Sequence, residues 1–576
     1  MPTNTLYPAT VLGSPCFWGA PYQDHTPEQL AALHDLGYRA VFVNIAWSRP
    51  WLDVVTLEEM IVAPSYPFCC DPPEDCAQKT LEMRRRVDAI LAAGLEPWFL
   101  FGSPRALNLD TMTEEQQTYC REQMQGSRTS RISRRNGVAC IQASAVRDLY
   151  SALLQAHLAA FPETAGFLIY TMDELAEVCD EADDCPRCQG VPLEERLPGY
   201  LAHLRAEIDR VSPDIRMFWE SWEFAATQVY AMVERLPERV NLAVHSCLHE
   251  VYYVNQPDLW FHHLMRLAEA NDVEVMVNLF LSGTGEDLGP VASYPCPRLV
   301  WQQLSQIARY PAVRALKEYY GTAVEHLNVN DWALRATLRH ADPDWDVVAD
   351  GLAERYAPIE ADTLLMAWEH AALALEVYPW DLTWRLRLYN TYRYDQHPGF
   401  DGYWDCGWLN TLATPWTTPS WESSRRGFYV TSDFGTPRLL DETNAGFARC
   451  MQHVATAEAA LDTALDTELA PSLRDELAMQ RVSLTLFRLM ARMRQLHLRA
   501  SRAAEAVRQG DPEQVETLAT LLDQDLANAR SLLTAAEGTP WQAFFLDDLR
   551  ATIATMAVER ADYDADPSAW CAGHLL

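Results

Sequence analysis

The sequence lacks three features that would place it in common functional classes. No stretch approaches the roughly 18 consecutive apolar residues that a membrane-spanning helix needs. The first residues, MPTNTLYPATVLGSPCFWG, contain neither the basic region nor the apolar core of a secretory signal peptide. Basic residues are outnumbered, with 46 Lys and Arg against 80 Asp and Glu, which gives a net charge of −34. These absences predict a cytoplasmic protein whose partners include neither nucleic acid nor a membrane.

The length and composition indicate a large globular protein. A chain of 576 residues is long enough for two or three domains, and a hydrophobic fraction of 49% is typical of a soluble protein with a substantial core. No internal repeat or low-complexity tail is apparent. The 19 tryptophans slightly favour a carbohydrate site, because flat aromatic faces suit sugar rings.

Short apolar runs alternate with amphipathic helical runs over the first 320 residues or so. The first predicted helix has Thr26 as its N-cap and Pro27 at its first position. Eight such alternations predict a (β/α)8 barrel. The rival, a doubly wound open sheet, usually has a Gly-rich phosphate loop after its first strand, and none is present. The predicted strands cover residues 16–19, 39–47, 96–101, 167–170, 215–220, 241–247, 273–280 and 313–319.

The alternation of strands and helices ends near residue 335. We therefore expect a catalytic barrel over residues 1–335 and a helical and Trp-rich irregular segment packed on it over residues 336–442. The Ala- and Leu-rich residues 443–576 predict an all-α antiparallel bundle. This helical region is where we expect any homo-oligomer to form.

The fourth predicted strand ends in two adjacent acids, Asp173 and Glu174, within GFLIYTMDELAEV. Carboxylates at the carboxyl end of a buried barrel strand lie where such barrels keep their chemistry. Two neighbouring carboxyls can divide labour when one stays ionised and the other is kept protonated as a general acid. The alternative is that the pair only caps the following helix.

Residues near the ends of the other strands suit the hydroxyls and the apolar face of a sugar. They are acids, amides, basic groups and aromatic rings, each of which has a structural alternative when taken alone. The candidate substrate-binding residues are Asn44, Trp47, Arg49, Arg105, Trp219, Glu220, Trp222, Glu223, His245, Asn278, Glu318 and Tyr320.

The segment FPETAGFLIYTMDE, which ends at Glu174, resembles the fourth-strand region of the β-N-acetylhexosaminidases of glycoside hydrolase family 20. The resemblance implies an exo-acting enzyme on β-linked N-acetylhexosaminides that needs no cofactor for catalysis. It also implies that Glu174 is the general acid/base and that Asp173 orients the acetamido group of the substrate. The carbonyl oxygen of that group is then the nucleophile.

Two other functions remain open at this point. A two-carboxylate glycosidase would use Glu174 as the acid and Glu318 or Glu220 as the nucleophile or base. A non-catalytic sugar-binding or scaffolding protein would instead turn the Asp173–Glu174 pair away from any cavity.

Cysteines form a second cluster of interest. Cys179, Cys185 and Cys188 follow a C-x5-C-x2-C pattern, and the C-x2-C part has the spacing of a zinc knuckle. A structural zinc would need a fourth thiolate, which we expect from the loop after the second strand, where the candidates are Cys69, Cys70 and Cys76. Unligated thiols or a disulfide are the alternatives.

Overall fold

The structure is a computed structural model of the whole chain. It describes residues 6–11, 25–46, 53–127, 137–172, 176–179, 181, 184–221, 224, 226–246, 256–279, 294–318, 322, 324–339, 344–379, 437–537 and 543–574.

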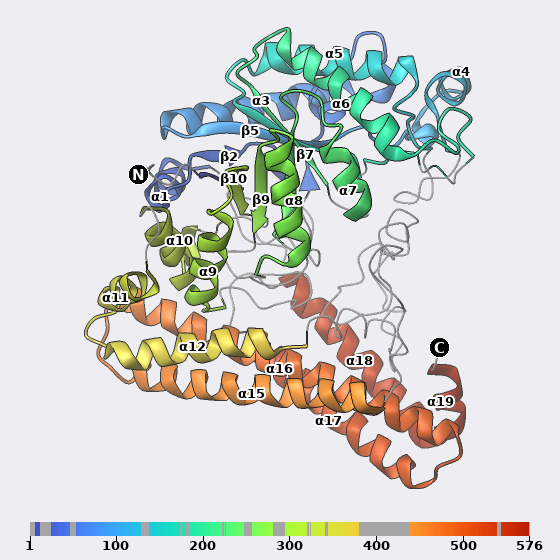
Figure 1. Cartoon of the computed structure of the whole chain (residues 1–576). Helices are drawn as coiled ribbons and strands as arrows, with labels where there is room; N and C mark the ends of the chain where they lie inside the picture. Colours follow the sequence, from blue (N-terminus) through green and yellow to red (C-terminus); the bar gives the residue numbers. More distant parts are fainter. Residues whose placement is uncertain are drawn as a thin grey trace.

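Eight parallel strands close into a barrel in the order β1-β10-β9-β8-β7-β6-β5-β2, as the sequence pattern predicts. Figure 1 shows this barrel above a layer of long helices. The strands are β1 (Tyr7–Val11), β2 (Ala40–Phe42), β5 (Glu96–Gly102), β6 (Gly166–Tyr170), β7 (Arg216–Glu220), β8 (Asn241–His245), β9 (Val275–Leu279) and β10 (Val313–Glu318).

Helices follow the strands around the outside of the barrel. At the first of them, Thr26 is the N-cap of a complete capping box and Pro27 occupies the first turn, as predicted. Gly37 ends that helix at φ 103°, a conformation that favours glycine. The helices of the barrel are α1 (Pro27–Leu36), α3 (Pro73–Ala92), α5 (Ser144–Ala160), α6 (Leu193–Asp209), α7 (Ala226–Val233), α8 (Leu259–Ala270), α9 (Pro297–Ile307) and α10 (Val329–Arg339).

The prediction of the first strand was wrong. Residues 7–11 pair with both β2 and β10 and close the barrel, whereas the predicted residues 16–19 lie outside the described part of the chain. The sequence YPATV contains a proline and a threonine, so it lacks the continuous apolar run expected of a fully buried strand.

Insertions separate β2 and β5 from the barrel helices that follow them. Between β2 and α3 the chain forms the small antiparallel pair β3–β4 and two short helices. Between β5 and α5 it forms three short helical segments. These inserted elements are β3 (Ile45–Ala46), β4 (Asp53–Val54), α2 (Leu57–Met60), η2 (Pro67–Cys69), η3 (Leu109–Thr111), α4 (Glu114–Tyr119) and the π-helical turn η4 (Cys120–Met124).

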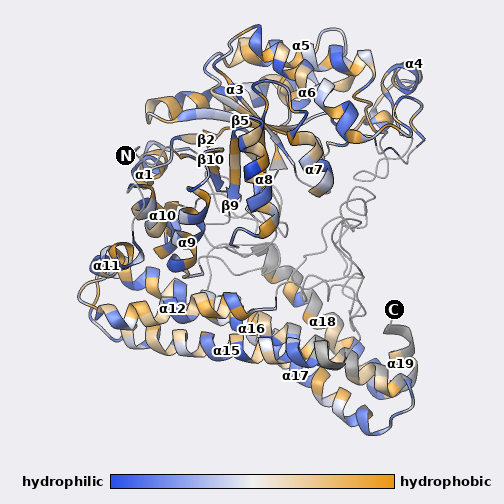
Figure 2. Ribbon diagram, in the orientation of Figure 1, coloured by the Kyte–Doolittle hydropathy of each residue, from blue (hydrophilic) through white to orange (hydrophobic). Residues whose placement is uncertain are grey.

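The remainder of the described chain is helical, as predicted for the carboxyl-terminal part. Figure 2 shows hydrophobic and hydrophilic residues interleaved along these long helices, which is typical of amphipathic packing. Helix α12 packs against α15, α15 against α16, and α16 against α17. The helices are η6 (Val324–His326), α11 (Trp345–Arg355), α12 (Ala361–Val377), α15 (Pro437–Leu465), α16 (Pro471–Arg508), α17 (Glu513–Ala536), α18 (Ala543–Ala565) and α19 (Pro567–His574).

Buried aromatic residues join the barrel to this helical layer. The hydroxyl of Tyr294, which precedes α9, donates a hydrogen bond of 2.9 Å to the carbonyl oxygen of Ala371 in α12. The Tyr294 ring lies edge-on to Phe487 of α16 at 4.9 Å. The domain boundaries near residues 335 and 442 remain predictions. Helices α12 and α15, which begin on opposite sides of most of the segment before residue 442, pack directly against each other.

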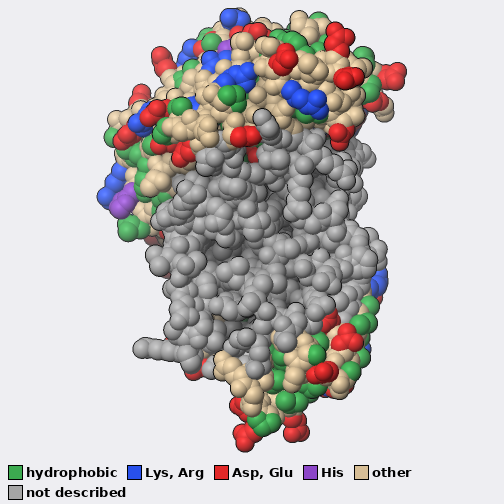
Figure 3. All heavy atoms as spheres, turned by 90° about the vertical axis from the view of Figure 1, so that its right-hand side faces the viewer, with side chains coloured by type: hydrophobic (Ala, Val, Ile, Leu, Met, Phe, Trp, Pro, Cys, Tyr) green, Lys and Arg blue, Asp and Glu red, His purple; other side chains and the backbone are tan. Residues whose placement is uncertain are grey.

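The surface reflects the acidic composition. On the face in Figure 3, Lys and Arg are interspersed with Asp and Glu over the barrel, while acidic side chains predominate at the far end of the helical layer. Within the part of the chain that the structure describes, no helix combines the length and apolarity needed to cross a membrane.

We expect His157→Phe to remove part of the sensitivity of the protein to acid. His157 of α5 is fully buried against Phe99 and Phe167, and neither ring nitrogen has a hydrogen-bond partner among the described residues. Burial lowers the pKa of His157 to about 3. The stability contributed by the neutral ring is therefore complete above the unfolded pKa near 6.5 and is lost as the pH falls towards 3.

Between pH 6.5 and pH 5 this loss amounts to about 2 kcal/mol. Urea unfolding at both pH values measures it, with a substitution of the exposed His34 by Gln as the control. An equal loss of stability in the wild type and in His157→Phe would contradict the assignment.

Candidate functional site

Four neighbouring barrel strands each place a polar residue among their last two positions. β7 contributes Glu220, β8 His245, β9 Asn278 and β10 Lys317. All four side chains are at most 3% exposed. We refer to these four residues as the polar ring. It occupies the carboxyl end of the barrel, where catalytic groups of this fold are held.

Contacts across intervening strands show that the polar ring faces the barrel interior. Nδ2 of Asn278 donates a hydrogen bond to Oε2 of Glu220, although β8 lies between their strands. Nζ of Lys317 lies 5.8 Å from the centre of the Phe42 ring, although β1 lies between β10 and β2. Side chains two strands apart can meet in this way only on the concave side of a closed sheet.

The polar ring combines an acidic and a basic side chain with a neutral imidazole. Burial and then the nearby charge of Lys317 lower the pKa of His245 well below its usual value. His245 is therefore neutral at neutral pH. Oδ1 of Asn278 has no hydrogen-bond partner within the described residues. The polar ring thus offers donors and acceptors for the hydroxyl groups of a small polar ligand.

The candidate catalytic pair follows the strand beside the polar ring. Tyr170, the last residue of β6, is the register partner of Glu220. Asp173 and Glu174 themselves lie outside the described residues. The chain is anchored just beyond them, because Ala176 forms a bridge with Arg105 and the backbone N–H of Glu177 donates to the carbonyl oxygen of Pro104 at 3.1 Å.

Two of the predicted substrate-binding residues have structural roles. The Oδ1 atom of Asn44 accepts a hydrogen bond from the backbone N–H of Leu100 at 2.9 Å, and its Nδ2 donates to the carbonyl oxygen of Val55 at 2.9 Å. Trp219 is fully buried on the outer side of β7, where Nε1 donates to Oγ1 of Thr171 at 3.0 Å. These hydrogen bonds connect elements of the scaffold.

Lys317 was missed in the sequence and its neighbour Glu318 was chosen in its place. Side chains alternate along a strand, so the inward position of Lys317 assigns Glu318 to the opposite side of β10. The alternation of side chains places Ala315 and Lys317 on one side of β10 and Leu316 on the other. A register shift between Val313 and Ala315 obscures this alternation.

Other predicted substrate-binding residues lie outside the described part of the chain. They are Trp47, Arg49, Trp222, Glu223 and Tyr320.

Arg105 lines a separate side pocket of about 610 Å³ between the loops that follow β2 and β5. Its guanidinium donates to Oγ1 of Thr56 at 3.1 Å and to Oε1 of Glu59 at 3.3 Å. Burial alone would lower the pKa of Arg105, but the charges of Glu59 and Glu58 outweigh it and raise the pKa. Arg105 is therefore a fixed cation in the wall of this pocket.

The same pocket contains a buried carboxyl group. Glu58 accepts a hydrogen bond from the hydroxyl of Tyr150, and its Oε2 has no partner among the described residues. Burial raises the pKa of Glu58, against the opposing effects of Arg105 and Tyr150. No feature of the sequence marks this residue, because Glu58 lies in an insertion away from the ends of the barrel strands.

The cysteines cluster differently from our expectation. Cys140, which precedes α5, lies beside Cys179, Cys185 and Cys188. The prediction that the fourth thiol comes from the loop after β2 is therefore wrong. Cys69 contacts Met124 and Cys70 lies near the backbone of Ala63 and Tyr66. Cys76 lies in α3, near the carbonyl oxygens of Glu58 and Asp71. Sequence spacing could not reveal Cys140, because it lies in a different loop from the other three.

Comparison with known proteins gives a likeness at the level of the fold. No family model and no curated protein matches the chain. A GH138 enzyme targeting pectin rhamnogalacturonan II superposes with a TM-score of 0.61 at 10% identity, and the match covers 98% of this chain and 68% of that enzyme. This likeness establishes a shared fold.

Two other solved structures match less well. The O-GlcNAc hydrolase of Thermobaculum terrenum has a TM-score of 0.38 at 11% identity, with 98% of this chain and 97% of that chain covered. The β-N-acetylhexosaminidase of Bacteroides fragilis has a TM-score of 0.37 at 11% identity, with 61% of this chain and 69% of that chain covered.

Proposed function

We propose that this protein is a glycoside hydrolase with its active site at the carboxyl end of the barrel. The observation that carries the proposal is the polar ring, which faces the interior next to the strand that leads into Asp173 and Glu174. A carboxylate, an amide, a neutral imidazole and an amine can bind sugar hydroxyls. The adjacent acidic pair can supply general acid/base catalysis.

The more specific proposal is an exo-acting enzyme on β-linked N-acetylhexosaminides. Its support is the Asp173–Glu174 pair after the fourth barrel strand, with Glu174 as the general acid/base and Asp173 orienting the acetamido nucleophile. This assignment leaves the polar ring to bind the hydroxyls of the sugar. The GH138 enzyme shares the fold, but one fold serves many substrates, so the proposed sugar rests on the resemblance of the segment ending at Glu174 to the family 20 β-N-acetylhexosaminidases.

One observation favours a two-carboxylate mechanism as the second candidate. Glu220 faces the barrel interior next to β6, and Glu318 is assigned to the other side of its strand. If a second carboxylate acts as nucleophile or base, Glu220 is the one in position. The non-catalytic alternative would bind the same sugars through the polar ring without turning them over.

A panel of aryl glycosides tests the proposal. We expect hydrolysis of the p-nitrophenyl β-glycosides of N-acetylglucosamine or N-acetylgalactosamine, because the acetamido group is the nucleophile. The corresponding glucoside and galactoside should be inert. Glu220→Gln should cost roughly 10- to 100-fold in kcat/KM, the value of one hydrogen bond to a charged group, and Glu318→Gln is the matched control with little effect.

Other outcomes of this panel contradict the proposal in distinct ways. Hydrolysis of a plain hexoside, together with a loss in Glu220→Gln as large as that in Glu174→Gln, supports the two-carboxylate mechanism. Failure to hydrolyse any glycoside, with sugar binding detected by calorimetry, supports the non-catalytic alternative.

A further inference from the structure

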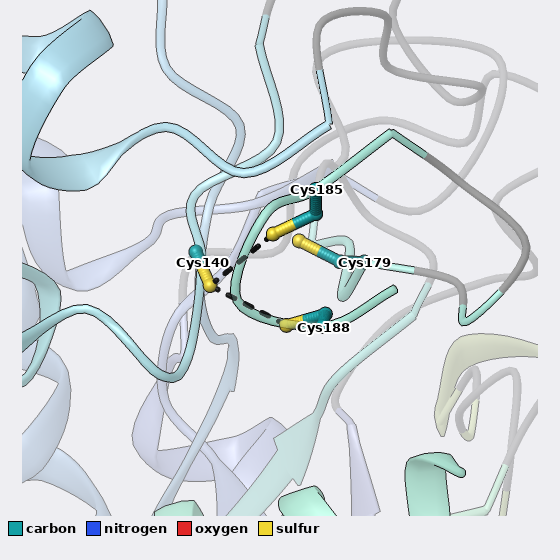
Figure 4. Close-up of side chains that lie close together, drawn as sticks. All are labelled: Cys140, Cys179, Cys185 and Cys188. Carbon is teal, nitrogen blue, oxygen red and sulfur yellow. Dashed lines mark hydrogen bonds between the residues drawn. The ribbon is translucent and has the colours of Figure 1, made fainter. Parts of the chain in front are cut away.

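Four buried thiols converge from two loops at the carboxyl end of the barrel. Cys140 comes from the segment before α5, and Cys179, Cys185 and Cys188 come from the loop after β6. All four side chains are fully buried. Figure 4 shows their sulfur atoms pointing towards a common centre.

The distances between the sulfur atoms fit a tetrahedral metal centre. Sγ of Cys140 lies 3.5 Å from that of Cys188 and 3.7 Å from that of Cys185, and all four Sγ atoms lie within 4.8 Å of one another. Four sulfurs at about 2.3 Å from one zinc ion lie about 3.8 Å apart. A disulfide would require a separation of about 2.05 Å, which neither measured pair approaches.

A buried arginine lies beside the cluster. No ion pair among the described residues balances its charge. Arg196 of α6 is 3% exposed, and its Nε donates to the carbonyl oxygen of Val191 at 2.9 Å. Its two terminal nitrogens have no hydrogen-bond partner within the described part of the chain. The backbone N–H of Val191 in turn donates to the carbonyl oxygen of Cys188 at 3.0 Å, which places Arg196 near the cluster. A zinc ion bound by four thiolates has a net negative charge, which would balance this cation.

The backbone brings two of the thiols together. Cys185 and Cys188 flank a tight turn in which the N–H of Cys188 donates to the carbonyl oxygen of Cys185 at 3.2 Å. This turn places both thiols in the cluster. Gly126 leaves the necessary space, since a Cβ atom there would lie 2.2 Å from Sγ of Cys179.

We propose that Cys140, Cys179, Cys185 and Cys188 bind one structural zinc ion. The set is closed, because four protein ligands leave no position for water or substrate. The ion would therefore tie the segment before α5 to the loop after β6. In the sequence, Asp173 and Glu174 precede Cys179 in that loop, so the zinc would hold in place the segment that follows the candidate catalytic pair.

Metal analysis of the full chain, purified without added metal, tests this proposal. We expect about one zinc per chain, released when a mercurial reagent modifies the four thiols. Cobalt substitution should give the thiolate charge-transfer and visible bands of a tetrahedral four-sulfur site. Cys140→Ser and Cys185→Ser should lose the zinc, whereas Cys76→Ser, which changes a buried cysteine outside the cluster, should retain it.

Gly126→Ala provides a variant that keeps all four thiols while crowding Cys179, and it should lower zinc occupancy. If the Cys variants do not fold, the zinc content and the cobalt spectrum of the wild type still test the proposal. Metal-free protein with four reactive thiols, full zinc retention in Cys140→Ser, or iron in place of zinc would each overturn the proposal. None of these measurements depends on glycosidase activity.

Discussion

Glu174→Gln should lower the hydrolysis of natural glycosides by roughly 10²–10⁴-fold, the usual contribution of general acid catalysis. If Glu174 is the general acid, as we propose, the substitution removes the proton donor and keeps the shape of the side chain. Substrates whose leaving group departs without protonation should lose far less. Comparison of kcat/KM for a chitobiose-type disaccharide and for a dinitrophenyl glycoside of the same sugar measures the difference.

Asp173→Asn should fail in a different way from Glu174→Gln. If the proposed roles hold, it retains the acid but removes the negative charge that would orient the acetamido group and stabilise the developing oxazolinium. Both classes of substrate should therefore slow by roughly 10²–10³-fold. Equal losses on both substrates in Glu174→Gln, with little effect of Asp173→Asn, would contradict the assigned roles.

The second large effect is expected on stability. If the four-cysteine centre binds zinc, Cys140→Ser should lower the free energy of unfolding by several kcal/mol, because binding energy of a structural zinc is folding energy. Chemical denaturation of the wild type with and without a strong chelator should give a similar loss. The chelator should have little further effect on Cys140→Ser.

Cys76→Ser is the matched control for stability. Cys76 is 2% exposed, and its sulfur lies 3.4 Å from the carbonyl oxygen of Asp71 and 3.7 Å from that of Glu58. A serine hydroxyl can donate to the same oxygens, so this change should cost about 1 kcal/mol or less. A loss as large as that in Cys140→Ser would show that buried thiols in general, and not a metal centre, explain the effect.

Most of the barrel could be predicted from the sequence, and the predicted ranges overlap all seven barrel strands after β1. The run at Phe167–Tyr170 is one example, and it forms β6. The first strand escaped prediction because Pro8 and Thr10 interrupt its apolar pattern. Its pairing with β2 and β10 outweighs the weak local preference, and this pairing depends on residues far away in the chain.

The members of the polar ring could be predicted in part, for a similar reason. Glu220, His245 and Asn278 were recognised because each lies at the end of an evident strand. Lys317 was not recognised, since a shift of one position in β10 exchanges the inward and outward sets of side chains. Cys140 was not recognised, because proximity between two loops depends on the tertiary fold and leaves no trace in the spacing of cysteines.

The closure of the barrel by β1 has a consequence for the synthesis of the protein. Tyr7 pairs with Ala315, so one partner emerges from the ribosome long before the other. At roughly 5–20 residues per second, the interval before β10 is available is on the order of tens of seconds. During that time β2 can cover one edge of β1, and the other edge stays open to incorrect pairing. Expression at a lower temperature or with added chaperones should therefore raise the yield of folded protein.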